Sequence, residues 1–473
     1  MTTRSQYGLS LFLKCVNIPL AMVKNKVFDV IVVGAGPAGM FACYELINSN
    51  PKLKIALIDM GNRIENRRKN EVMSGFGGAG AYSDGKLQFT PKLSHERVFS
   101  IISPKEYQVY LDRIDQIFMD FGVKAESYPK NEDEVNKLVD DAQRKDIELI
   151  VRRAKHVGTD NLKQVIIEFQ KYLEGRGVKF FDKTEVKDLE ITQNTFRSVQ
   201  TTKGLIRGKR VLLTPGRIKA KWLQQIGDKY HMDYVYDMVE VGVRVEFPAS
   251  IMKILADALY EIVFKIRTNT FDDVVRTFCT CPNGMVAIEN YEGYVCVNGH
   301  SNSDHKSENS NFAFVVEVHL TEPVENSIQY AQSIAQLAST IGGGKPILQR
   351  LSDLRKGRRS TWSRLSKSMV IPSLIDVTPG DISMALPHRI VTDILEGLEK
   401  LDLVMPGINS GSTLLYAPEV KFRSSKVKTT PGMETTVKGV FVAGDASGLS
   451  GTITGAAATG MMAAQGILKS LKK

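Results

Sequence analysis

Three glycines and one aspartate near the N-terminus have the types and the spacing that can hold a diphosphate. Gly34, Gly36 and Gly39 follow the G-x-G-x-x-G spacing, and Asp59 comes about 20 residues after the last of them. The first glycine allows a tight turn, the second lets the backbone approach a pyrophosphate, and the third lets a helix pack closely on a strand. An aspartate at this distance accepts hydrogen bonds from a ribose 2′-hydroxyl and repels a 2′-phosphate. The spacing therefore predicts binding of a dinucleotide.

The sequence also predicts the elements that must position these residues. Residues 29–33 are almost wholly apolar, which predicts a parallel strand buried on both faces. Residues 40–47 have helical character. Pro37 and Ala38 precede them at the helix N-terminus, where N–H groups and the helix dipole attract negative charge. Residues 54–58 predict a second strand. Because strand, turn, helix, strand and acid occur in register, we favour dinucleotide binding over a glycine-rich turn without a ligand.

A second nucleotide-binding element near the C-terminus distinguishes FAD from NAD. Residues 440–443 predict a buried strand that ends at Gly444 and Asp445, and a helix of small residues follows from about Gly455 and Ala456. This arrangement resembles FAD enzymes of the glutathione-reductase type, in which the Gly-Asp pair binds the ribityl chain and the helix directs its N-terminal N–H groups at the flavin N1–C2=O edge. The resemblance implies FAD, because an NAD-dependent dehydrogenase would not need this second element.

Two further strands fit the same cofactor. Residues 210–216 predict a strand that returns to the nucleotide-binding sheet and ends at Gly216. Residues 178–186 predict a strand whose end meets the adenine through the backbone at Val186. Each is an ordinary strand when taken alone. Together with the two motifs in chain order, they strengthen the FAD interpretation.

The segment 74–87 contains five glycines and follows the second strand. Glycine is costly in regular structure and is tolerated where the backbone must approach something closely. In the flavoproteins that this chain resembles, such a loop crosses the pyrophosphate and passes under the isoalloxazine. We therefore expect N–H groups of Gly77, Gly78 and Gly80 to face phosphate and flavin. The side chains that can face the flavin ring are Ser83, Asp84 and Lys86.

From about residue 28 to the C-terminus, the chain resembles a family of FAD-dependent dehydrogenases whose label carries no substrate. The segments that carry the resemblance are 76–87, 156–162, 276–284, 298–304, 380–387, 414–422 and 444–445. The resemblance implies FAD and redox chemistry.

The fold class that follows is α/β, with a discontinuous Rossmann-like FAD-binding domain on a parallel sheet and a mixed α+β substrate domain built on a second sheet. The expected FAD-binding segments are 26–95, 150–225 and 405–473, with a helical insertion at 96–149. Residues 226–404 form the expected substrate or cap domain, and residues 1–25 an N-terminal extension. Within the substrate domain, residues 239–247 alternate like a half-exposed strand. An antiparallel sheet under the flavin is the expected substrate platform.

Composition limits the location and the partners. A length of 473 residues with 43% hydrophobic residues predicts a globular protein of at least two domains. Five cysteines favour a reducing compartment, so we expect a cytoplasmic protein. A signal peptide over residues 9–23 is the alternative, and no apolar run is long enough to span a membrane. The net charge of +10 is spread along the chain. We interpret the basic runs 63–71 and 354–359 as solvated faces, with one run steering an anionic substrate or a cofactor phosphate as the alternative, and we expect no nucleic acid partner.

Several other side chains could do chemistry, but none is assigned a catalytic role. We interpret Cys279 and Cys281 as two cysteines on a strand next to the flavin or the core, with a redox or metal pair as the alternative. The chain has no Cys-x-x-Cys pair, which argues against a disulfide reductase, and we expect no metal site. Candidate acids, bases or substrate contacts are His300, Asn302, His305 and His388.

The predicted function is that of an FAD-dependent oxidoreductase, a dehydrogenase or reductase that transfers a hydride between flavin N5 and a small organic substrate. NADH or NADPH is a compatible electron donor, although the chain has no second G-x-G-x-x-G after a strand. The alternatives are a flavin monooxygenase, a non-catalytic flavin sensor, and a flavoprotein that binds nucleic acid or a membrane surface.

Overall fold

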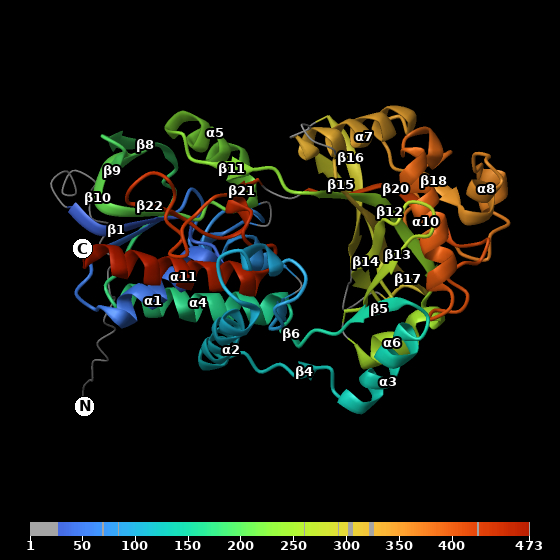
Figure 1. Ribbon diagram of the computed structural model, residues 1–473, viewed down its shortest axis with the longest axis horizontal. Helices are drawn as coiled ribbons and strands as arrows, with labels where there is room; N and C mark the ends of the chain where they lie inside the picture. Colours follow the sequence, from blue (N-terminus) through green and yellow to red (C-terminus); the bar gives the residue numbers. More distant parts are fainter. Residues whose placement is uncertain are drawn as a thin grey trace, which may run out of the picture.

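The protein has two lobes, each built on its own large β-sheet (Figure 1). The computed structural model describes residues 27–68, 71–83, 85–259, 261–291, 293–300, 306–320, 326–422 and 425–472. We call the lobe with the seven-stranded sheet the first lobe and the lobe with the eight-stranded sheet the second lobe. The expected N-terminal extension, 1–25, lies outside the described residues. The chain is thus a mixed α/β protein with several sheets, which confirms the predicted fold class at this level.

The first-lobe sheet collects strands from three distant stretches of the chain. Its strands are β1 (Val27–Val33), β2 (Ile55–Ile58), β7 (Lys179–Phe181), β8 (Val186–Thr192), β9 (Thr195–Thr201), β10 (Gly204–Leu213) and β22 (Val440–Val442). The pairs β7–β2, β2–β1, β1–β10 and β10–β22 are parallel, whereas β9 and β8 add an antiparallel edge. All residues of β2 are buried, as expected for a parallel strand covered on both faces.

The helices of the first lobe pack against this sheet and against one another. They are α1 (Pro37–Ser49), α2 (Pro104–Asp120), α4 (Thr159–Gly175), α5 (Ala220–Tyr230) and α11 (Ile453–Leu471). α1 and α11 lie side by side (Figure 1). A Cβ on Gly460 of α11 would lie 2.1 Å from the carbonyl oxygen of Ala38, so glycine is required for this close helix contact.

The second-lobe sheet is almost entirely antiparallel. Its strands, in spatial order, are β19 (Thr378–Pro379), β18 (Ile347–Arg350), β20 (Leu414–Lys421), β12 (Val239–Pro248), β17 (Asn309–Val318), β14 (Val274–Cys281), β13 (Val263–Arg267) and β5 (Ile147–Ile150). The hairpin of β15 (Met285–Tyr291) and β16 (Tyr294–His300) lies beside it. The helices of this lobe are α3 (Glu132–Gln143), α6 (Lys253–Ala258), α7 (Ser327–Ile341), α8 (Leu351–Arg355), α9 (Trp362–Leu365) and α10 (His388–Leu401).

The two faces of the second-lobe sheet differ in chemistry. One face is apolar and is covered by α7 and α10. The other face carries Glu240, Arg244 and Glu246 of β12, which are at most 1% exposed. The sequence predicts a half-exposed strand here, and the structure shows that this prediction of exposure was wrong. Charged residues could be buried because distant strands supply counter-charges, as Arg276 of β14 does for Glu240.

The boundaries also differ from the sequence prediction in three places. β20 lies between β18 and β12, so residues 414–421 belong to the second-lobe sheet and not to the first lobe. β5 pairs with β13, so the expected helical insertion supplies an edge strand of the second-lobe sheet. The predicted strand 178–186 is divided, because β7 ends at Phe181 and Val186 begins β8 after a turn.

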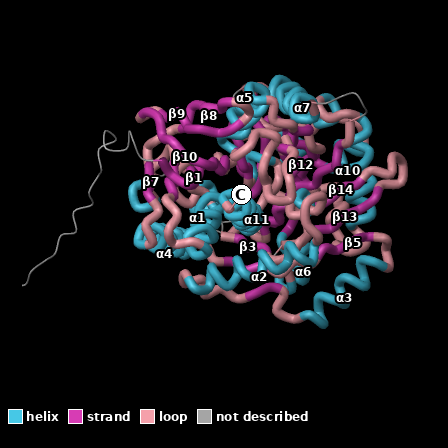
Figure 2. The backbone as a smooth tube through the Cα atoms, turned by 60° about the vertical axis from the view of Figure 1, so that its left-hand side comes forward, coloured by secondary structure: helices cyan, strands magenta, loops and turns pink. Residues whose placement is uncertain are grey.

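The connection between the lobes runs through short elements. β3 (Lys86–Gln88), β6 (Ala154–His156) and β4 (Ser127–Tyr128) form a three-stranded sheet, and β11 (Tyr234–Val235) pairs with β21 (Lys426–Val427). Figures 1 and 2 place α2, α3 and α6 along one edge of the molecule. The chain therefore passes from the first lobe to the second and back between α2 and β6.

Candidate functional site

Two glycines of the fingerprint are required by packing inside the first lobe. Gly34 has a φ of +103°, and a Cβ on it would lie 2.1 Å from the carbonyl oxygen of Thr214. A Cβ on Gly39 would lie 1.9 Å from the carbonyl oxygen of Gly34. Such distances are far below van der Waals contact. These two positions therefore need glycine whether or not a ligand binds.

Gly36 is different, because the protein itself has room for a side chain there. Its dihedral angles are ordinary for extended backbone, φ −75° and ψ −175°. A Cβ on it would meet only the Cα of Gly78, at 3.8 Å. Glycine at this position leaves the N-terminus of α1 bare, which is what close approach of a phosphate group needs. The residues present thus fit the pyrophosphate of a dinucleotide.

The glycine-rich loop lies between the N-termini of two helices. A Cβ on Gly80 would lie 3.4 Å from side-chain carbons of both Pro37, in the first turn of α1, and Ile453, the first residue of α11. Helix N-termini carry partial positive charge and free N–H groups. Two such ends therefore meet at one loop, which favours an anionic group there.

The expectation that N–H groups of Gly77 and Gly78 face a phosphate was wrong. The Gly77 N–H donates to the carbonyl oxygen of Ala35 at 2.8 Å, and the Gly78 N–H donates to that of Gly75 at 2.8 Å. Both glycines have positive φ, +86° and +58°, because the loop turns tightly to reach α1. Glycine is therefore required at both positions by the turn, and at Gly78 also by its close approach to Gly36.

Arg67 holds this loop, and the sequence analysis missed it. The guanidinium donates to four backbone carbonyl oxygens, those of Glu71, Val72, Phe76 and Gly78, at 2.7 to 3.3 Å. The residue is only 7% exposed. Interpreting the run 63–71 as a solvated face was therefore wrong for Arg67. No local pattern separates it from Arg68, which is exposed.

Asp59 lies at the end of β2, as predicted, and its carboxylate organises three turns. Oδ2 accepts the N–H of Ala35 at 2.8 Å, and Oδ1 accepts those of Gly61 at 2.8 Å and Gly75 at 2.9 Å. Burial raises the pKa of Asp59 and these three hydrogen bonds oppose the rise. A carboxylate oxygen has about two acceptor sites, so Oδ2 retains capacity for a hydroxyl. Binding of a ribose stays a prediction.

The two later FAD-related motifs come together at the end of the first-lobe sheet. Gly216 follows β10 with a φ of +68°, and Gly444 follows β22 with a φ of +80°. The Gly444 N–H donates to Oγ1 of Thr459 in α11 at 3.0 Å. Oδ2 of Asp445 accepts a hydrogen bond from Nε of Arg217 at 3.0 Å. Parallel pairing of β10 with β22 thus places Gly216 beside Gly444 and Asp445.

α11 begins at Ile453, two residues earlier than predicted, and Thr452 caps it. The Gly455 N–H donates to Oγ1 of Thr452 and the Ala456 N–H donates to the Thr452 carbonyl oxygen, both at 2.9 Å. The expectation that these two N–H groups are directed at a flavin was therefore wrong, since the helix itself uses them. A Cβ on Gly455 would lie 3.2 Å from Nδ1 of His95, so this glycine makes room for a histidine.

His95 is a fully buried histidine at the N-terminus of α11, and the sequence offered no signal for it. Its Nδ1 lies 3.0 Å from the hydroxyl of Tyr107, and its Nε2 lies 3.3 Å from Oγ1 of Thr452. Burial and, secondarily, the charge of Arg152 lower the pKa of His95 to about 3. The imidazole is therefore neutral at physiological pH and can act as a hydrogen-bonding group beside the helix terminus.

The low pKa of His95 predicts acid sensitivity. An unfolded chain binds a proton at this imidazole below a pH of about 6.5, whereas the folded protein does not until about pH 3. The free energy of unfolding should therefore fall as the pH falls through this range, by up to about 1.4 kcal/mol per pH unit. Urea denaturation at pH 7 and pH 5 measures this slope. His95→Gln should flatten it by about 2 kcal/mol over the two pH units, and His388→Gln, at an exposed site, should leave it unchanged.

A cavity of about 650 Å³ lies where β3, β4 and the second lobe meet. Lys86 and Tyr128 line it from the short three-stranded sheet, and Thr280, Pro282 and Asn283 line it from the end of β14. Its size suits a small organic molecule. The structure thus places Lys86 at this cavity.

Buried ion pairs next to this junction retain unused donors. Arg152 donates to Gln88 and Glu261, and Arg276 pairs with Glu240. Within the described ranges, Nε of Arg152 and Nη1 of Arg276 are buried and have no hydrogen-bond partner. An unsatisfied buried donor is costly. These N–H groups can therefore donate hydrogen bonds to an oxygen acceptor.

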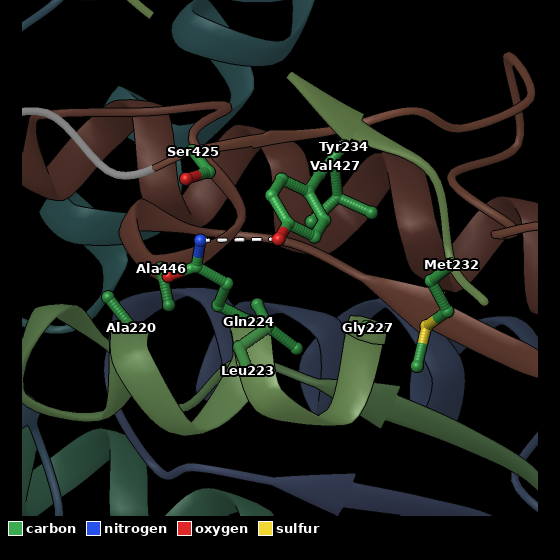
Figure 3. A pocket seen from close by; sticks show the side chains of 9 residues that line it. All are labelled: Ala220, Leu223, Gln224, Gly227, Met232, Tyr234, Ser425, Val427 and Ala446. Carbon is green, nitrogen blue, oxygen red and sulfur yellow. Dashed lines mark hydrogen bonds between the residues drawn. The ribbon is translucent and has the colours of Figure 1, made fainter. Parts of the chain in front are cut away.

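A second, much smaller cavity has no room for a substrate. It measures about 20 Å³ and lies between α5, β11 and β21 (Figure 3). Nε2 of Gln224 donates to the hydroxyl of Tyr234 at 3.3 Å across it. A volume of this size holds about one water molecule.

Of the remaining candidates, the structure places His388 away from the site. His388 begins α10, which covers the apolar face of the second-lobe sheet, and its ring packs against Phe271 with centroids 6.4 Å apart. Asp84, Asn302 and His305 lie outside the described residues. In the part of the chain that is described, no group of three His, Cys, Asp or Glu residues could hold a metal ion. Among the described helices, none has the length and apolar character needed to cross a membrane.

A protein-family model matches part of the chain. Residues 239–422 match the family described as FAD-dependent protein, C-terminal domain-like. An uncharacterized protein of Clostridium beijerinckii is 24% identical to this chain in an alignment 483 residues long. The alignment covers 93% of this chain and 80% of that protein.

Solved structures of two oxidoreductases are similar to this chain at low sequence identity. A variant of E. coli quinol fumarate reductase FrdA is 13% identical, with a TM-score of 0.46, over 94% of this chain and 71% of the other. The 3-ketosteroid-Δ4-(5α)-dehydrogenase of Rhodococcus jostii RHA1 is 12% identical, with a TM-score of 0.45, over 95% and 99%. These scores are too low to carry a conclusion. The family match, which spans the second-lobe sheet from β12 to β20, supports an FAD-dependent protein.

Proposed function

We propose that this protein is an FAD-dependent oxidoreductase that acts on a small organic molecule at the junction of its lobes. The observation that carries the proposal is the position of Gly80, where an added Cβ would lie 3.4 Å from side-chain carbons of both Pro37, in the first turn of α1, and Ile453, in the first turn of α11. Two helix N-termini and a glycine-rich loop thus converge where a dinucleotide diphosphate needs positive partial charge and bare backbone. The match of residues 239–422 to a family of FAD-dependent proteins supports the same cofactor.

In this proposal the first lobe is a discontinuous Rossmann-like domain of the glutathione-reductase-like class. Asp59 would bind the adenosine ribose through Oδ2, and Val186 would meet the adenine through its backbone. Gly444 and Asp445 would hold the ribityl chain, with Arg217 orienting the Asp445 carboxylate through their 3.0 Å hydrogen bond. When bound, FAD would supply two-electron redox chemistry.

The second lobe would supply the substrate side of the site. Lys86 lines the 650 Å³ cavity from one side and the end of β14 lines it from the other. His95 is neutral and hydrogen-bonded to Tyr107. It therefore adds no positive charge to the partial positive charge at the N-terminus of α11. The few cysteines of the chain lead us to propose that it acts in the cytoplasm.

An anaerobic absorbance titration tests this proposal. The purified protein is expected to show a flavin spectrum, and NADH and then NADPH are added. Bleaching would identify a nicotinamide as the electron donor and a reductase as the activity. A spectrum that stays oxidised would indicate a substrate-side donor. A colourless protein that cannot be loaded with FAD would contradict the proposed function.

A further inference from the structure

The three most exposed large apolar side chains of the described residues lie in one short segment of the second lobe. They are Met369, which is 87% exposed, and Ile371 and Ile375, which are each 76% exposed. A fourth, Trp362, is 52% exposed and begins α9, a few residues earlier in the chain. Exposure this high means that the side chains project beyond their neighbours. A group of such side chains marks a surface that binds something.

The segment that carries these side chains is held firmly on the second lobe. Val370 and Val377 are buried in a small apolar cluster with residues of β18 and β20. The Ser373 N–H donates to the carboxylate of Glu246 at 3.2 Å, and Oγ of Ser373 accepts the N–H of Val286 at 3.0 Å. The packing thus fixes which side chains of the segment point inward, and it leaves the three most exposed ones outside.

A dense group of cations is continuous in the chain with these apolar side chains. Residues 354–375 contain six lysines and arginines and no aspartate or glutamate. Nη1 of Arg364, in α9, donates to the carbonyl oxygen of Arg359 at 2.6 Å, so α9 lies against the basic turn that follows α8. Except for Arg364, which is half-buried, all six are exposed: Arg355, Lys356, Arg358, Arg359, Arg364 and Lys367.

The turn before β20, residues 409–412, brings the basic turn and the apolar segment together. Nη1 of Arg355 donates to the carbonyl oxygen of Asn409 at 3.1 Å. The Met369 N–H donates to Oγ of Ser412 at 3.3 Å. The basic turn and Met369 therefore contact the same four-residue turn. Positive charge and exposed apolar side chains are neighbours in space as well as in sequence.

The acids that flank the segment are already paired. Asp353 is buried and forms ion pairs with Arg350 and Arg358. Asp376 forms an ion pair with Lys345 at 2.6 Å. Two glutamates of α10 line a cavity of about 370 Å³ together with Arg355. The exposed cations outside these contacts are Lys356, Arg359 and Lys367.

We propose that this basic apolar surface, made of the six cations with Trp362, Met369, Ile371 and Ile375, binds membranes that contain anionic lipids. The cations lie at the lipid phosphate groups, and the apolar side chains enter the boundary between headgroups and acyl chains. Apolar side chains that project singly suit a fluid surface, whereas a protein partner needs a matching pocket for each.

A second copy of the chain fits this surface less well than an anionic membrane does. A symmetric dimer that uses the same surface on both copies would place six cations against six. Repulsion between like charges opposes that contact. Anionic lipid headgroups instead supply the opposite charge.

This inference goes beyond the proposed function and does not depend on FAD binding. Figure 1 places α8, which the basic turn follows, at the end of the second lobe away from the first lobe. The basic turn is thus separate from the glycine-rich loop. The proposal also departs from the interpretation of the run 354–359 as a solvated face only.

Co-sedimentation of the full chain with sucrose-loaded vesicles tests the proposal. The protein is expected to bind vesicles of equal parts phosphatidylcholine and phosphatidylglycerol at low salt. Binding to vesicles of phosphatidylcholine alone should be at least about tenfold weaker. High salt should release the protein, because salt screens the attraction. Equal binding to the two kinds of vesicle would overturn the proposal.

Two combined variants assign the binding to this surface. One removes the apolar side chains, and the other removes the exposed cations outside the ion pairs. Each should bind the anionic vesicles at least about tenfold more weakly. The two variants are Met369→Ser with Ile371→Ser and Ile375→Ser, and Lys356→Gln with Arg359→Gln and Lys367→Gln.

Two matched controls change the same kinds of side chain elsewhere. Ile254→Ser removes an isoleucine of α6 that is 71% exposed. The combination of Lys137→Gln, Arg144→Gln and Lys179→Gln removes three exposed cations. Both controls should bind within about twofold of the parent chain. Circular dichroism checks that every variant is folded. Weakening by the controls as large as that by the two surface variants would overturn the proposal.

The fluorescence of Trp362 gives a second, independent measurement. The chain has two tryptophans, so Trp222→Phe leaves Trp362 as the only one. Its emission should shift to shorter wavelengths when anionic vesicles are added, because the ring leaves water. An unshifted spectrum from vesicle-bound protein would overturn the proposal. A dimer that the apolar variant dissociates, without vesicle binding by the parent chain, would identify a second copy as the partner and would also overturn it.

Discussion

Replacing Gly36 by valine is expected to remove bound FAD while the fold stays stable. The protein offers room for a Cβ at Gly36, with the nearest atom, the Cα of Gly78, at 3.8 Å. The added side chain would instead cover the N-terminus of α1, where a pyrophosphate must approach. We expect the flavin-to-protein ratio to fall at least about tenfold and the melting temperature of the apoprotein to change by no more than about 2 °C. Absorbance and thermal denaturation measure the two effects.

Gly39→Val is the matched comparison, because it places the same side chain three residues later on the same helix. There a Cβ would lie 1.9 Å from the carbonyl oxygen of Gly34. The backbone must move, so the free energy of unfolding should fall by about 3 kcal/mol or more. A Gly36→Val protein that keeps its full complement of FAD would contradict the assignment of Gly36 to the pyrophosphate. Equal destabilisation by both substitutions would show that Gly36 serves packing as well.

Replacing Arg67 by alanine is expected to produce the largest loss of stability outside the core. Five N–H donors of the guanidinium bind four backbone carbonyl oxygens of the segment 71–78. Without them, buried carbonyl groups of the glycine-rich loop lose their partners. We expect the free energy of unfolding to fall by about 3–5 kcal/mol. Flavin should be lost as well, because the loop no longer reaches the N-termini of α1 and α11. Urea denaturation and flavin absorbance measure both effects.

Two further variants separate the geometry of Arg67 from its charge. Arg67→Lys keeps the charge but has three donors on one nitrogen, which cannot reach carbonyl groups on both sides of the loop. It should therefore rescue little of the stability. Arg68→Ala removes an exposed neighbour and should change the free energy of unfolding by less than about 0.5 kcal/mol. An Arg67→Ala protein as stable as Arg68→Ala would refute the role of the guanidinium.

The strand–turn–helix unit that carries Gly34, Gly36 and Gly39 could be predicted from the sequence because its determinants are local. A β-branched apolar run predicts β1, and the glycine spacing is required by contacts between residues only a few positions apart, as between Gly39 and Gly34. The position of Asp59 could be predicted for the same reason, because Asp59 directly follows the apolar run that forms β2. A strand before Gly444 and Asp445 could also be predicted, because a second apolar run ends there. The structure shows that this strand, β22, pairs with β10 in the parallel sheet.

Tertiary structure alone decided which charged and polar residues are buried. Arg67, His95 and Arg244 have ordinary sequence surroundings, yet each is at most 7% exposed. A charge or an imidazole can be buried only where other elements supply partners. Here those partners are the carbonyl groups of a loop, the hydroxyl of Tyr107, and Glu419 of a strand far along the chain. Pairing between strands far apart in the chain is also the reason that β20 and β5 belong to the second-lobe sheet.

The sequence by itself thus determined the strand–turn–helix unit with its glycine spacing, because contacts within that one unit specify it. Tertiary structure decided that two helix N-termini meet at Gly80 and that the guanidinium of Arg244 is buried beside Cys281. Such convergence depends on which distant strands become neighbours, and the burial of apolar surface over the whole chain selects that pairing.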